Sequence, residues 1–206
     1  MRWLATLAVV AVVAAACGPT RSAPAPVRTT PRAPQTSFTA PGNPTPTPLC
    51  PAAPSQPSNI ATITMENGGV IVILLQPDKA PKTVSNFAFR ANKGLYDGLT
   101  FHRVVANFVV QGGDPFSSVG NPFGDKIGQG GGTQCTELSN LPFDKGAVGI
   151  ARGPDINISN DFQFFICIGE CHFLNGQYTN FGLVAKGQEV ADAIRIGDRI
   201  KTITVK

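Results

Sequence analysis

Several features are scarce in this sequence, and each shortage narrows what the protein can be. The apolar run at residues 4–13 falls short of the about 20 residues that a membrane-spanning helix needs. There are only two histidines, His102 and His172, and the spacing Cys167-x3-Cys171-His172 offers at most part of a zinc site. Residues 130–132 are glycines, but no Lys-Ser/Thr pair follows them as in a phosphate-binding loop. Neither a metal ion nor a nucleotide cofactor is therefore expected.

Acidic residues are absent from the part of the chain before residue 59. The chain has 17 Lys+Arg against 13 Asp+Glu, and four of the arginines, Arg2, Arg21, Arg28 and Arg32, lie in that part. The remainder is near neutral, with 13 basic and 13 acidic residues. A nucleic-acid-binding face needs clustered Lys and Arg, so no nucleic-acid partner is expected.

The N-terminus has the pattern of an export signal. Arg2 supplies a positive charge, residues 4–13 form a short apolar core, and residues 14–16 are alanines that precede Cys17. Small residues before a cysteine resemble the bacterial lipobox, in which the cysteine is lipidated and becomes the new N-terminus. We therefore expect residues 1–16 to be a signal peptide and Cys17 to anchor the protein on the extracytoplasmic side of the cell membrane. The alternative is an ordinary secretory signal with an A-x-A cleavage site, which would give a secreted protein.

A proline-rich segment follows the signal. Residues 18–58 contain 12 of the 18 prolines, together with many Thr, Ser and Ala. Such a composition cannot bury enough apolar surface to offset the entropy of ordering, and proline favours extended conformations. We predict that residues 17–58 are a disordered tether, which holds a folded domain of residues 59–206 away from the membrane.

The chain has five cysteines. An exported protein folds in an oxidising compartment, so one or two disulfides are expected among the four that remain if Cys17 is lipidated. These are Cys50, Cys135, Cys167 and Cys171, and they allow three complete pairings, among which the sequence does not choose. Cys167 lies in an apolar run and has the character of a small buried side chain, so the other three are the better candidates.

Beyond residue 59 the pattern is one of short strands with an early and a late helix. β-Branched runs on either side of an Asn-Gly-Gly turn at residues 67–69 indicate a hairpin. Pro81 suits a first helical turn, apolar residues then recur at helical spacing, and Gly94 ends the helix. Strands are predicted over residues 60–65, 70–75, 108–111, 147–151, 164–168, 180–184 and 200–205, and a second helix over residues 187–194. The alternation predicts a mainly β domain, a closed antiparallel barrel capped by two α-helices.

Two stretches carry most of the functional information. FHRVVANFVVQGGDP, residues 101–115, brings together an arginine, aromatic rings, an amide side chain and a Gly-Gly-Asp turn. FQFFICIG, residues 162–169, repeats the theme of an amide among aromatics. Together they resemble the signature of cyclophilins, the peptidyl-prolyl cis-trans isomerases that cyclosporin inhibits. The resemblance covers residues 59–206 and implies an eight-stranded barrel with a substrate groove on its outer face, and no cofactor.

Arg103 matches the catalytic arginine of that family, and the chemistry explains why an arginine is needed. Amide resonance makes rotation about an Xaa-Pro bond slow, with a barrier of about 18–20 kcal/mol. In the twisted state the proline nitrogen gains a lone pair that barely exists in the planar ground state. A guanidinium that donates to this lone pair therefore binds the transition state selectively. Gln111 matches the glutamine that orients the arginine and meets the substrate backbone.

The resemblance assigns further residues to the substrate groove. The pocket for the proline ring would be lined by Phe108, Val109, Phe165 and Leu174. The remaining matches, which lie near the groove or pair with the bound peptide, are Ala151, Arg152, Gln163, Phe173 and Tyr178.

Several of these positions depart from the common family pattern. Val109 stands where many relatives have methionine, Arg152 where they have asparagine, and Tyr178 where they have histidine. The loop at residues 153–161 is also about two residues longer than the common form. Phe173 replaces a tryptophan and lacks the indole N–H, so weakened but not abolished cyclosporin binding is expected.

These features predict an exported peptidyl-prolyl isomerase, a monomer that assists folding by acting on proline-containing segments of exported proteins. One alternative is a non-catalytic proline-peptide binding module or holdase chaperone on the same fold, since fold alone does not establish activity. Another is a structural surface lipoprotein. Arg103 argues for the enzyme, because a binding module needs no donor aimed at the proline nitrogen.

Overall fold

The structure is a computed structural model that describes residues 59–120 and 124–206. The predicted signal peptide at residues 1–16, the lipidated Cys17, the tether at residues 17–58 and Cys50 lie outside the described residues, and they stay predictions. Within the described part, no helix is long and apolar enough to cross a membrane.

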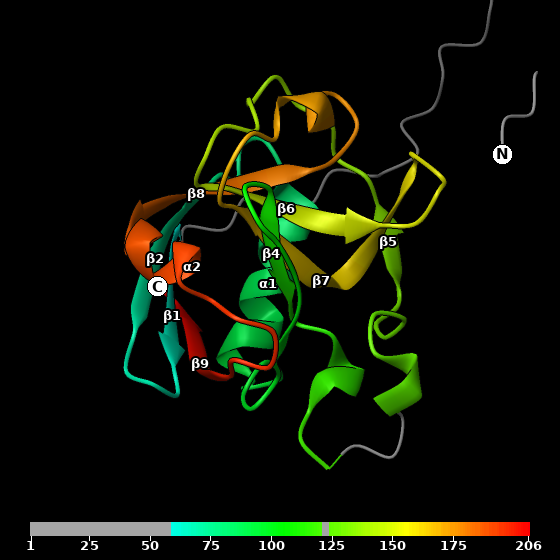
Figure 1. Cartoon of the computed structure of the whole chain (residues 1–206). Coiled ribbons are helices and arrows are strands. Elements are labelled where there is room, and N and C mark those ends of the chain that lie inside the picture. The colour runs from blue at the N-terminus through cyan, green and yellow to red at the C-terminus, as the bar shows by residue number, and fades with distance from the viewer. Residues whose placement is uncertain (1–58, 121–123) are drawn as a thin grey trace, which may run out of the picture. The chain divides into compact units, whose positions relative to one another are not determined.

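A single antiparallel sheet forms the framework of the described chain (Figure 1). Its strands are β1 (Ile60–Met65), β2 (Val70–Leu75), β3 (Phe101–Val105), β4 (Val109–Gly112), β5 (Thr133–Cys135), β6 (Ala147–Arg152), β7 (Ile158–Cys167), β8 (Asn180–Lys186) and β9 (Ile200–Val205). The order across the sheet is β3-β4-β7-β6-β8-β2-β1-β9, and the short β5 pairs with β7 beside this path. The helices are α1 (Pro81–Asn92) and α2 (Gln188–Asp192), with 3-10 turns η1 (Pro115–Ser117), η2 (Gly124–Lys126) and η3 (His172–Leu174).

The sheet curls until its two end strands approach each other. One isolated bridge, between Thr100 and Arg199, links the segment before β3 to the segment before β9. The Phe101 N–H also donates to the Asp198 carbonyl at 2.8 Å. The predicted mainly β fold, with eight antiparallel strands and two helices, is confirmed. The prediction of a closed barrel was slightly overstated, because one bridge and a few hydrogen bonds, rather than a full ladder, join the two ends of the sheet.

Helix α1 covers one opening of the curled sheet, and Figure 1 shows it between the β1-β2-β9 side and the β7 side. Its apolar face is buried against the sheet interior, where Phe87 lies 5.5 Å from the Phe164 ring of β7 and 5.2 Å from the Phe181 ring of β8. Ala80, before the helix, makes no side-chain cap. The Glu137 carboxylate accepts instead from the Lys82 and Thr83 N–H groups, at 3.0 and 2.8 Å. A distant segment thus satisfies the helix N-terminus.

Most predicted elements are confirmed, and two of the differences have a common cause. Strands β3 and β5 were not predicted, and β7 begins at Ile158 rather than Phe164, so the predicted loop at residues 153–161 ends at Asn157. The first half of β7 is polar and pairs with β5, which also lacks apolar residues. Side chains help to hold that pairing, since the Ser159 and Thr136 hydroxyls lie 2.8 Å apart. Apolar alternation, the main signal for a strand, is missing there.

A second, smaller apolar cluster lies on the other face of the sheet from the main core. Its buried members are Val109, Phe143, Ala147, Phe165, Cys167, Cys171 and Leu174. Cys167 and Cys171 form a disulfide in this cluster, so the expectation that Cys167 is an unpaired buried thiol was wrong. The turn after β7 brings the two Cα atoms to 6.3 Å, which its apolar sequence did not reveal. Cys135 is disulfide-bonded as well.

The turn that carries this disulfide packs tightly on the β3-β4 hairpin. Gly169 lies so close to the backbone of Asn107 that an added Cβ would overlap the Asn107 carbonyl. Asn107 itself has a φ of 58°, in the left-handed region. The contact places Phe108, the next residue, against η3.

We therefore expect Gly169→Ala to lower the free energy of unfolding by about 1–3 kcal/mol, because backbone atoms must move to admit the methyl group. Gly153→Ala is the matched control, since nothing lies within 4 Å of its added Cβ. That change should be neutral or stabilise by about 0.4–1 kcal/mol through the unfolded state. Urea unfolding of both variants checks the prediction, and equal midpoints for the two would contradict it.

Candidate active site

A hollow of about 240 Å3 lies on the outer face of the sheet, over β3, β4, β6 and β7. Alternation along the strands places it there. Val110 and Phe164 point into the main core, while their neighbours Gln111 and Phe165 point to the opposite face. The hollow is lined by Arg103, Phe108, Val109, Gln111, Ala151, Arg152, Phe165, Leu174 and Tyr178. All of these were predicted site residues.

The polar edge of the hollow is a chain of side-chain hydrogen bonds. Arg103 and Gln111 are cross-strand neighbours on β3 and β4, and the Arg103 Nη1 donates to the Gln111 Oε1 at 3.3 Å. The Gln111 Nε2 donates to the Gln163 Oε1 at 3.0 Å. Gln163 is buried, and its Nε2 donates to the carbonyls of Gly130 and Gly128, at 2.7 and 3.2 Å. Gln163 therefore orients Gln111 and does not line this hollow, but it lines the adjoining one.

Asp114 ends this chain, and the sequence analysis did not identify it as a site residue. Its side chain is fully buried and accepts from the N–H groups of Gly128, Gly130 and Phe116, the last two at 3.3 and 2.7 Å. These bonds fix the backbone of Gly128 and Gly130, whose carbonyls accept from the Gln163 side chain. The signal that could have revealed it is the Asp-Pro step in GGDP, because Asp114 is the N-cap of η1.

The apolar wall of the hollow is built on the second cluster. Phe165 is 4% exposed, and its ring is stacked on Phe143 at 5.7 Å and lies edge-on to Tyr178 at 5.9 Å. Phe173, another predicted site residue, does not line the hollow. It is 62% exposed, and its ring packs on Phe108 at 5.0 Å, so it supports the wall from outside.

A second hollow of about 340 Å3 adjoins the first, and the two share Gln111, Ala151 and Arg152. Arg152 is held by several contacts at this boundary. Its Nε donates to the Gln177 carbonyl at 2.8 Å, and its Cζ lies 4.3 Å from the centroid of the Tyr178 ring. Two of the positions that depart from the common family pattern, residues 152 and 178, are therefore in direct contact.

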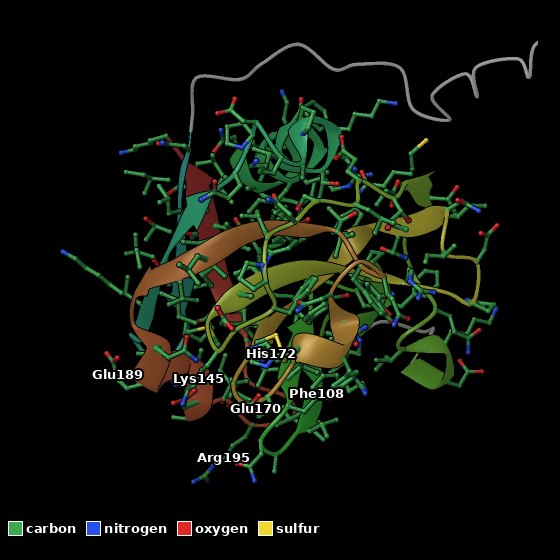
Figure 2. The ribbon with its side chains drawn as sticks, turned by 90° about the horizontal axis from the view of Figure 1, so that it is seen from above. Phe108, Lys145, Glu170, His172, Glu189 and Arg195 are labelled. Carbon is green, nitrogen blue, oxygen red and sulfur yellow. A yellow bond between two sulfur atoms is a disulfide. The ribbon has the colours of Figure 1, made fainter. Side chains whose placement is uncertain are left out.

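The two histidines have opposite environments. Burial lowers the pKa of His102, although the nearby Asp114 carboxylate acts against this. Both ring nitrogens of His102 are buried, and the Thr100 backbone and the Gln163 side chain beside the ring also act against the lowering of the pKa. A hydrogen bond to Asp144, at 2.5 Å, raises the pKa of the exposed His172, and Glu170 adds to the effect. Figure 2 shows Glu170 and His172 at the turn that carries η3, with Phe108 next to it. Across residues 59–120 and 124–206, no group of three His, Cys, Asp or Glu residues could hold a metal ion.

The arrangement suits one kind of chemistry. An apolar pocket can hold a small ring, and a guanidinium at its edge can donate a hydrogen bond to an atom of that ring. A guanidinium is a planar cation with several donors, and Gln111 fixes the direction in which that of Arg103 points. The site therefore offers electrostatic stabilisation at a defined position.

Comparisons with known proteins agree on one family. The model of the family described as "Cyclophilin type peptidyl-prolyl cis-trans isomerase/CLD" matches residues 60–205. The chain is 36% identical over 160 residues to a probable peptidyl-prolyl cis-trans isomerase of Brucella suis, covering 75% of this chain and 81% of that protein. It is 42% identical over 145 residues to peptidyl-prolyl cis-trans isomerase B of Bacillus subtilis, covering 69% and 94%.

A solved structure is similar in fold. It is the cyclophilin type peptidyl-prolyl cis-trans isomerase of Cryptosporidium parvum, crystallised in the presence of the dipeptide Ala-Pro. The TM-score is 0.61 at 25% identity, over 71% of this chain and 98% of that one.

The histidines give a prediction for stability against pH. Below an unfolded-state pKa of about 6.5, the unfolded chain takes up a proton at residue 102 that the folded protein resists, so this site costs stability as the pH falls. His172 has the opposite sign. Its contribution is fully present below the unfolded pKa and is lost as the pH rises through the folded pKa.

Urea unfolding at about pH 7.5 and about pH 5 measures both effects. Between these values His102→Gln should lose less stability than wild type, and His172→Gln should lose more. Indistinguishable pH dependences for the three proteins would show that neither shift is present.

Proposed function

The chain belongs to the family of cyclophilin-type peptidyl-prolyl cis-trans isomerases, and from this premise we propose that the hollow beside Arg103 is its active site. The activity is rotation about Xaa-Pro bonds. The observation that carries the proposal is the position of the Arg103 guanidinium, which hydrogen bonds to Gln111 at the rim of an apolar pocket.

In the proposed mechanism the protein stabilises the twisted amide. The proline ring sits against Phe165 and Leu174, which hold it while the residue before it rotates. As resonance is lost, the proline nitrogen becomes a hydrogen-bond acceptor, and Arg103 donates to it. Because the planar ground state offers almost no such acceptor, the bond lowers the barrier rather than merely tightening binding. No covalent intermediate is needed.

Binding of the peptide backbone is proposed at Ala151 and Arg152. The register between β6 and β7 shifts between Ile150 and Arg152, so Ala151 lies in an irregularity of the ladder, where its backbone can meet an added segment. The relative from Cryptosporidium parvum was crystallised in the presence of Ala-Pro, which supports a proline-containing peptide as the ligand of this groove. Weakened cyclosporin binding stays a prediction that rests on Phe173.

The cellular setting is part of the proposal. The leader, Cys17 and the proline-rich segment at residues 17–58 support an exported, lipid-anchored enzyme that assists the folding of exported proteins. The Cys167–Cys171 disulfide suits an oxidising compartment. Attachment through lipid would hold the isomerase on the outer side of the cell membrane.

Replacing Arg103 tests the catalytic assignment. Arg103→Ala should lower kcat/KM for an Xaa-Pro peptide by about 10²- to 10³-fold, the usual effect of removing one transition-state donor. A protease-coupled isomerisation assay measures this, and circular dichroism reports whether the variant is folded. Arg195→Ala is the control, because that exposed arginine lines neither hollow. Near wild-type activity in a folded Arg103→Ala protein would remove Arg103 from the mechanism.

Metabolic labelling with a fatty acid tests the anchor. The wild-type chain should incorporate the label in a bacterial host and sediment with membranes, whereas Cys17→Ser should do neither. Stable anchoring needs more than one acyl chain, as a bacterial lipoprotein carries. Cys50→Ser is the matched control and should stay labelled. Equal labelling of wild type and Cys17→Ser would point to an ordinary secretory signal instead.

A further inference from the structure

Two arginines line the proposed proline pocket, and nothing in it balances their charge. Arg103 and Arg152 both face the first hollow, while no Asp or Glu lines it. The second hollow has one carboxylate, Asp155, which accepts from the backbone and side chain of Asn157 at 2.9 and 3.1 Å. None of the ion pairs formed within residues 59–120 and 124–206 includes either arginine. The groove therefore presents uncompensated positive charge.

Arg152 is fixed in place before any ligand arrives. Its Nη1 donates to the carbonyls of Gly153 and Pro154, at 2.8 and 3.4 Å, in addition to the Nε bond to Gln177 and the contact with the Tyr178 ring. None of the hydrogen bonds among the described residues uses its Nη2. A side chain held in this way loses little rotamer freedom when it meets a ligand, so its charge is available at low entropic cost.

The arrangement of the two hollows also indicates which residues of a bound peptide lie near Arg152. The proline nitrogen must face Arg103 for the proposed catalysis, and the chain enters the proline through that nitrogen. The second hollow opens on the same side, because it shares Gln111, the hydrogen-bond partner of Arg103, with the first. Leu174 and Phe108 line the first hollow but not the second. The residues that precede the proline therefore pass Arg152 as they enter the second hollow.

We propose that Arg152 makes this enzyme select Xaa-Pro segments that carry an acidic residue at one of the two positions before the proline. The inference rests on the proposed function, because it needs the proline in the first hollow. Arg152 sets specificity through its charge, whereas Arg103 acts on the bond that rotates. Tyr178 contributes by holding the guanidinium over its ring. A basic residue at the same positions is disfavoured for the same reason.

The test uses the full chain and three peptides that differ only before the proline: Ala-Glu-Pro-Phe, Ala-Gln-Pro-Phe and Ala-Lys-Pro-Phe, together with the set that shifts the variable residue by one position. At low ionic strength kcat/KM should be about two- to fivefold higher for Glu than for Gln, the range of a partly exposed ion pair, and lower for Lys. The preference should shrink at about 0.5 M salt, where charges are screened over a few ångströms.

Variants assign the preference to one side chain. Arg152→Gln should bring the Glu-to-Gln ratio to about one, Arg152→Lys should keep part of it, and Arg195→Gln should leave it unchanged. The ratio is taken within each variant, and circular dichroism shows that the variant is folded, so a general loss of activity or of folding cannot imitate the loss of preference.

The outcomes separate the two proposals. A wild-type ratio of one at low salt in both peptide sets, with good activity on Ala-Gln-Pro-Phe, overturns the charge selection and leaves the proposed function standing. A ratio that survives in Arg152→Gln overturns the role of Arg152. A folded wild-type chain that is inactive on every peptide overturns the proposed function, and this inference with it.

Discussion

The site depends on hydrogen bonds that begin at a carboxylate in the protein interior. Arg103 is exposed and would sample many rotamers by itself. Its direction is set by Gln111, which is oriented by the buried Gln163, and Gln163 bonds to glycine carbonyls that Asp114 holds. In a low-dielectric interior such a chain is strong when every member is satisfied, and costly when one is not. An exposed cation thereby acquires the fixed position that its proposed role in transition-state stabilisation requires.

The same strands supply stability on one face and the site on the other. In β4 and β7, Val110 and Phe164 belong to the main core, while Gln111 and Phe165 face the groove. A slip of one residue in register would exchange the two sets. Positioning of the site therefore needs no separate scaffold, because the packing that holds the curled sheet together also places each groove residue. The Cys167–Cys171 disulfide strengthens this arrangement, since it ties η3, which carries Leu174, to the end of β7.

The elements that could be predicted from the sequence are those with strong apolar periodicity and clear turn residues. Strands β1, β2 and β9 and helix α1 were predictable because apolar periodicity and turn residues agree there. The polar strand β5 lacks such periodicity and depends on pairing with β7. Five of the nine groove residues came from two short motifs and the other four from the family resemblance along the rest of the domain, whereas contacts between distant positions needed the fold. The stacking of Arg152 on Tyr178 is one such contact, and the bonds that Asp114 makes to residues 128 and 130 are another.

Positive charge in the groove also bears on the chain's own N-terminal extension. Residues 18–58 hold 12 of the 18 prolines, and an enzyme joined to such a segment meets it at an effective concentration of up to about millimolar. That segment has no acidic residue and contains Arg21, Arg28 and Arg32. The charge selection proposed for Arg152 would therefore disfavour these prolines as ligands of the groove. A chain that carries many prolines of its own would in this way keep the proposed site available to other segments.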